Sequence, residues 1–220
     1  MAFPGVDLGL VAWVGLAPWL AWIPGRSPGR AALGGLVAGI VFHLVGLWWI
    51  ADTMMRHGNL PDILVVPVAA SVLLVLALYL SLFPAAFAAA LAWLHPATAP
   101  AFVLSAAILW IALEYLRAHL LSGFPWNLLG YSQYQNFALL PLVTVTGVYG
   151  LSFLVLAVNA SLAWGLVGWG RGREVGSAAT VAAVLVALAL VPGGLIVRAP
   201  PRGVPIPVTL ACFIHERART

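Results

Sequence analysis

The sequence has very few charged residues and no lysine at all. Only 7% of the 220 residues are Asp, Glu, Lys or Arg, against roughly 25% in ordinary soluble domains, while 63% are hydrophobic. So few charges could not cover the surface of a water-soluble protein of this length. The single cysteine, Cys212, excludes a disulfide-rich secreted scaffold, and the high hydrophobicity excludes intrinsic disorder. The composition therefore predicts an all-α polytopic membrane protein.

Long apolar runs divide the chain into candidate membrane-spanning helices. A helix needs about 20 apolar residues to cross the hydrocarbon core. By that criterion the expected spans are residues 6–23, 31–51, 63–94, 99–121, 138–169 and 175–197. Residues 1–198 are thus expected to form a bundle of about six transmembrane helices. Residues 199–220 are expected to be a Pro/Gly-rich linker and a short extracytoplasmic tail.

Arginine placement predicts the orientation of the bundle. Cytoplasmic loops carry an excess of basic residues, and the short loops of one side hold Arg26, Arg30, Arg171 and Arg173. We therefore expect that side to be cytoplasmic. The loop of residues 52–62 and the polar segment of residues 122–137 then lie on the opposite side, where every polar cluster of interest gathers.

Glu114 and Arg117 form the most polar pair within an expected span. They are three residues apart, so they can meet on one helix face. A charge inside a span costs a few kcal/mol unless it is paired or faces a polar cavity. Because both residues lie within about two turns of the helix end, two interpretations stay open: a substrate-binding pair, or a structural pair that reaches the interface.

Two extracytoplasmic loops supply the other candidate substrate-binding residues. The first loop carries His57 with two carboxylates and an arginine, which suits contact with a lipid headgroup or a substrate amine, or a solvated loop with a local ion pair. The second interleaves aromatic side chains with amides, and either anchors the bundle at the interface or shapes a lipid-facing pocket. Its candidates are Phe124, Pro125, Trp126, Asn127, Tyr131 and Gln133. We expect no metal ion and no cofactor.

The motifs around these candidates resemble one known family. Residues 110–117 (WIALEYLR), 122–126 (SGFPW) and 129–133 (LGYSQ) look like the membrane domain of bacterial apolipoprotein N-acyltransferases, and residues 57–61 (HGNLP), 79–84 (YLSLFP) and 147–153 (GVYGLSF) fit the same pattern. The resemblance covers most of residues 2–198. It implies a multi-pass protein of the bacterial inner membrane.

The resemblance also implies an activity and its partners. Family members transfer an acyl chain from a membrane phospholipid to the N-terminal amine of a diacylated apolipoprotein, with the bilayer as their setting and no nucleic acid involved. They use a Glu-Lys-Cys triad on an extracytoplasmic nitrilase-like domain. This sequence has no lysine, so residues 199–220 are expected to be the start of a truncated nitrilase-like domain and the chain alone to be inactive.

Other interpretations remain open beside this one. A separately encoded nitrilase-like domain would make the chain half of a split enzyme. A non-enzymatic membrane bundle, either a small transporter or a lipid-handling scaffold, is the alternative from another class. A degenerate gene product without a role is the third.

Overall fold

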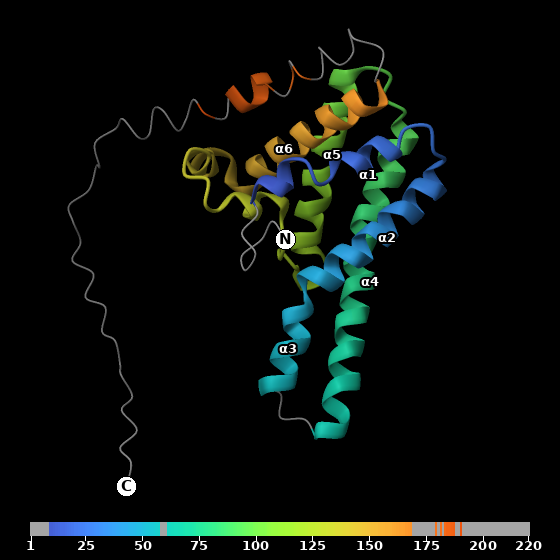
Figure 1. The fold of residues 1–220 in the computed structure, drawn as a ribbon, viewed down its shortest axis with the longest axis vertical. Coiled ribbons are helices and arrows are strands. Elements are labelled where there is room, and N and C mark those ends of the chain that lie inside the picture. The colour runs from blue at the N-terminus through green and yellow to red at the C-terminus, as the bar shows by residue number, and fades with distance from the viewer. Residues whose placement is uncertain are drawn as a thin grey trace, which may run out of the picture.

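The computed structural model describes residues 9–57 and 61–168, together with residues 179, 181, 183–187 and 190. Within these residues every regular element is a helix, as Figure 1 shows. The predicted helical membrane fold is confirmed. The expected linker and tail, and most of the sixth expected span, lie outside the described residues.

Four apolar stretches of the described chain are long enough to cross a membrane. The first combines α2 (Pro28–Gly46) and α3 (Trp48–His57), which are separated by a break at Leu47. The others are α4 (Asp62–Leu94), α5 (Ala99–His119) and α6 (Leu140–Val167). The start of α5 follows from its sequence, because the Thr98 hydroxyl accepts a hydrogen bond from the Ala101 amide at the N-cap.

The described part of the first expected span, from residue 9 onward, is broken. It consists of a 3₁₀ segment, η1 (Gly9–Trp13), and a short helix, α1 (Ala17–Trp22). The buried amide of Asn159 on α6 explains the break. Its Oδ1 accepts from the Leu16 amide at 2.9 Å and its Nδ2 donates to the Ala12 carbonyl at 2.7 Å, which satisfies backbone groups that a continuous helix would pair itself.

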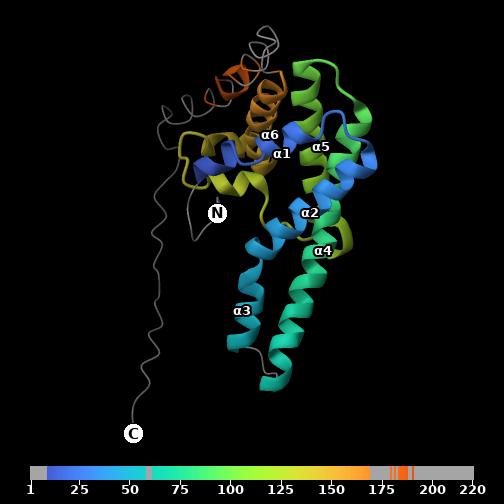
Figure 2. The same cartoon turned by 45° about the vertical axis from the view of Figure 1, so that its right-hand side comes forward.

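Helices α2 and α4 approach each other closely through glycine. A Cβ atom on Gly39 would lie 2.6 Å from Pro84 Cγ and 3.0 Å from Ser81 Cα, and one on Gly35 would meet the Pro84 carbonyl oxygen. Small residues that let helix backbones approach are a common means of helix association in bilayers. The two helices lie side by side in Figures 1 and 2, and α3 and the first half of α4 project together from the rest.

The remaining helices enclose a mainly aromatic and small-residue core. Helix α6 packs against α5, α1 and η1, and a further 3₁₀ segment, η3 (Leu129–Gln133), packs against α6. Phe87 and Phe102 are completely or almost completely buried there, and Trp19 and Trp110 pack against Phe87. This packing leaves a hollow between α1, α2, α4 and α5.

Candidate functional site

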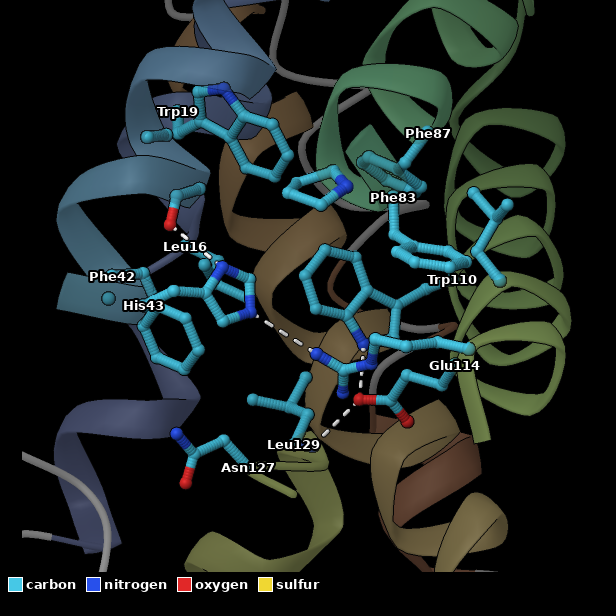
Figure 3. Close-up of a pocket in the computed structure, with 16 residues that line it drawn as sticks. Leu16, Trp19, Phe42, His43, Phe83, Phe87, Trp110, Glu114, Asn127 and Leu129 are labelled. Carbon is cyan, nitrogen blue, oxygen red and sulfur yellow. Dashed lines mark hydrogen bonds between the residues drawn. The ribbon is translucent and has the colours of Figure 1, made fainter. Parts of the chain in front are cut away.

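A cavity of about 230 Å³ lies among four helices and the loop that follows α5. Helix α1 contributes Trp19, α2 contributes Phe42 and His43, and α4 contributes Phe83 and Phe87 (Figure 3). Helix α5 adds Trp110, Glu114 and Arg117, the loop adds Asn127, and Leu129 lines the cavity from the segment beyond the loop. The cavity thus has aromatic walls and one polar end.

Glu114 fastens the loop to α5 at that polar end. The residue is only 4% exposed, and its Oε1 accepts two hydrogen bonds. The indole N–H of Trp110, one turn earlier on the same helix, donates at 2.9 Å, and the Leu129 amide donates at 2.7 Å. Because Leu129 begins η3, the carboxyl group of Glu114 determines where the loop turns back toward α6.

Arg117 reaches across the cavity to α2. It is 6% exposed, and its Nη1 donates to Nε2 of His43 at 3.3 Å. The other ring nitrogen of His43, Nδ1, donates to the Gly39 carbonyl at 2.8 Å. Since Nε2 accepts and Nδ1 donates, the imidazole proton is assigned to Nδ1.

Glu114 and Arg117 share the cavity but are not joined as an ion pair. In the described part of the chain, the pair of opposite charges within 4.0 Å is Arg56 and Asp52 of α3, at 2.8 Å, with the Arg56 side chain largely exposed. The expected common helix face is present. The two side chains use it to bond to a loop and to a second helix, respectively.

Asn127 closes the cavity from the loop side. Its backbone adopts a left-handed conformation with φ of 55°, which asparagine tolerates better than most residues. Its side chain lies against α2 at Gly46, where an added Cβ would be 2.5 Å from Asn127 Nδ2. The buried Nδ2 has no hydrogen-bond partner.

Comparison with known proteins identifies the family of this site. A family model described as the apolipoprotein N-acyltransferase N-terminal domain matches residues 1–161. The chain belongs to this family. The match includes Glu114, Arg117 and the whole loop through Gln133.

Curated relatives named apolipoprotein N-acyltransferase agree with the family match. The relative from Geobacter metallireducens is 37% identical over 162 residues, which is 74% of this chain and 30% of that relative. The relative from Nitrosomonas europaea is 36% identical over 171 residues, 78% of this chain and 31% of the relative. The relative from Caulobacter vibrioides is 32% identical over 211 residues, 94% and 37% of the two chains. The chain thus spans about a third of the acyltransferases it matches.

Two of the expected binding residues, Phe124 and Trp126, form an aromatic group with Trp49, and Pro125 lies between them in the chain. The Trp126 ring packs against Trp49 of α3 in a tilted arrangement with centroids 5.0 Å apart, and the Phe124 ring lies 6.3 Å from that of Trp126. Trp126 and Pro125 are exposed, whereas Phe124 is half-buried and its amide donates to the Arg117 carbonyl at 3.0 Å. These residues connect the loop to α3 at the outside of the bundle.

Three other expected residues lie away from the cavity. Gln133 is buried, and its amide accepts from Trp13 and donates to the Gly9 carbonyl and Ser132 hydroxyl, so it fastens η1 to η3. Tyr131 is exposed beside it. His57 is exposed at the end of α3, the helix that projects from the others in Figure 1. The structure therefore brings together Glu114, Arg117 and Asn127, but none of these three.

His43 is not among the binding residues that the sequence predicts. In the structure it is the partner of Arg117, and Trp110 and Trp19 also line the cavity. The sequence does contain a signal for this contact. A buried arginine requires a hydrogen-bond acceptor, and His43 is a polar side chain deep within the second span. No group of three or more metal-binding side chains occurs in the described residues.

Proposed function

We propose that this chain is the membrane part of a bacterial apolipoprotein N-acyltransferase and holds lipid substrates for acyl transfer. In this proposal it resides in the inner membrane. The donor is a membrane phospholipid and the acceptor is a diacylated apolipoprotein, as the resemblance of its motifs implies. The observation that carries the proposal is the cavity with aromatic walls and a buried Glu114–Arg117–His43 end.

The chemistry of the cavity supports a lipid ligand. Aromatic and aliphatic side chains can contact an acyl chain, and a few placed polar groups fix its orientation, as in ligand sites generally. Ionisable residues inside a membrane bundle are costly, and they mark functional sites by default. The paired rings of Trp49 and Trp126, the residue before Asn127, suit the boundary of the bilayer, which indole rings favour.

The sequence lacks a residue type that acyl transfer in this family requires. The Glu-Lys-Cys triad that the resemblance implies requires a lysine, and the sequence contains none. We propose that these 220 residues bind substrates without transferring the acyl chain, and that a nitrilase-like domain supplies the triad.

Photo-crosslinking tests the substrate-holding role. The chain is placed in phospholipid nanodiscs with a diacylated lipopeptide that carries a photoreactive group in one acyl chain. We expect labelling of peptides from α2, α4 and α5, and no N-acylated lipopeptide by mass spectrometry. Labelling confined to the exposed outer faces of the helices would contradict the substrate role, and N-acylated product would contradict the inactivity.

A further inference from the structure

Hydrogen-bond donors without acceptors are concentrated in the cavity. In the described part of the chain, six buried side-chain nitrogen or oxygen atoms have no hydrogen-bond partner, and four of them belong to residues that line this cavity. Three of the four are N–H donors: Arg117 Nε, Asn127 Nδ2 and Trp19 Nε1. Buried polar groups are normally paired, so these donors suit a ligand that supplies acceptor oxygens.

The fourth atom is an acceptor and not a donor. It is Oε2 of Glu114, whose Oε1 accepts from Trp110 and Leu129. An ester carbonyl oxygen accepts hydrogen bonds without carrying a charge.

The depth of the donors corresponds to the ester level of a bilayer. Helix α5 has 21 residues and is therefore about 31 Å long, close to the roughly 30 Å of the hydrocarbon core. Arg117 lies two residues before the end of α5 and Asn127 lies in the loop beyond it. Both donors therefore lie near one boundary of the hydrocarbon, where glycerol esters join acyl chains to headgroups.

We propose that the cavity binds an ester group of a diacyl glycerolipid. Arg117 Nε–H and Asn127 Nδ2–H donate to ester carbonyl oxygen, and the acyl chain lies against Phe42, Phe83 and Phe87. The inference rests on the proposed function for its substrate class, yet it concerns recognition of the ester alone and requires no acyl transfer. It predicts that the cavity distinguishes ester-linked from ether-linked lipids with identical headgroups.

Competition between two synthetic lipids tests this inference. The purified chain in a non-ionic detergent receives equal amounts of diacyl and dialkyl phosphatidylcholine of the same chain length, and native mass spectrometry counts the bound lipids. With two hydrogen bonds to the ester, we expect about tenfold preference for the diacyl lipid. Equal binding of the two lipids overturns the proposal.

Two asparagine variants test whether Asn127 causes the preference for the diacyl lipid. Asn127→Gly removes the amide while keeping a residue that accepts positive φ, and it should reduce the preference severalfold. Asn136→Gly makes the same change at an amide of the same loop outside the cavity lining, and it should leave the preference intact. An unchanged preference in Asn127→Gly overturns the assignment of this donor.

Further competitors distinguish a site for ester oxygen from a site for anions. Displacement of the diacyl lipid by inorganic phosphate or by oleate at equal concentration would show an anion site and overturn the ester assignment. Absence of ester preference with retained lipopeptide crosslinks would disprove this inference alone. Loss of the crosslinks with retained ester preference would instead contradict the substrate-holding role.

Discussion

Arg117 of α5 donates a hydrogen bond to His43 of α2 across the cavity, 3.3 Å from Nη1 to Nε2. The two residues are 74 positions apart in the chain. Helix α2 packs on α3 and α4, and α5 packs on α4 and α6, so this bond spans helices that are otherwise separated by the cavity. It keeps the guanidinium at the polar end, where its Nε faces no protein acceptor.

Replacing His43 should therefore destabilise the bundle. His43→Leu fills a similar volume but removes the acceptor of Arg117 Nη1, and an unsatisfied charged donor costs about 1–3 kcal/mol or more. We expect a lower midpoint of thermal unfolding in detergent for His43→Leu. The control is His119→Leu on α5, whose ring is exposed and bonds only to its own helix. Equal shifts in the two variants would show that the Arg117 bond contributes nothing.

A second prediction concerns the close contact between α2 and α4. Gly39→Ala places a Cβ 2.6 Å from Pro84 Cγ and 3.0 Å from Ser81, so the helices must separate, at a cost of about 1–3 kcal/mol. Gly29→Ala is the matched control on the same helix, because nothing lies within 4 Å of an added Cβ there. Thermal unfolding of the two variants measures the difference. If Gly39→Ala is no less stable than Gly29→Ala, the helices do not approach as closely as described.

The amide of Asn159 should control the broken first segment. Asn159→Leu leaves the Leu16 amide and the Ala12 carbonyl without their partner, and each buried orphan costs about 1–3 kcal/mol. We expect faster proteolysis of the segment Gly9–Trp22. Ser161→Ala is the control, since the Ser161 hydroxyl bonds only to the Ala157 carbonyl of its own helix. Unchanged proteolysis in Asn159→Leu would mean that packing alone holds the segment.

The helices that follow local rules were predictable, and the contacts between distant residues were not. The expected spans 63–94 and 99–121 agree with α4 (Asp62–Leu94) and α5 (Ala99–His119) within about two residues, because apolar length and the Thr98 cap are local signals. The break in the first span depends on Asn159, which is 143 residues from Leu16. The periodicity of the sequence does not predict a hydrogen bond between residues so far apart.

The site was predicted in part for the same reason. Glu114, Arg117 and Asn127 were recognisable as polar residues at a helix end and in a turn. Gln133 bonds to Trp13 and Gly9 of η1, whereas the Asn127 Nδ2 in the cavity has no partner. This difference depends on which groups surround each side chain. Both are amides in one loop, and only tertiary packing distinguishes them.

The last prediction concerns the carboxyl group that holds the loop. In Glu114→Gln the amide oxygen can still accept from Trp110 and from the Leu129 amide, so the loop should stay in place. In Glu114→Leu both donors lose their acceptor, and the loop around Leu129 should open. Hydrogen exchange of the Leu129 amide, followed by mass spectrometry of peptides from residues 126–135, measures this directly. We expect at least tenfold faster exchange in Glu114→Leu, because a buried lost acceptor costs about 1–3 kcal/mol and 1.4 kcal/mol corresponds to a factor of ten. Slow exchange in both variants would show that the loop is held by the burial of Leu128 and Leu129 instead.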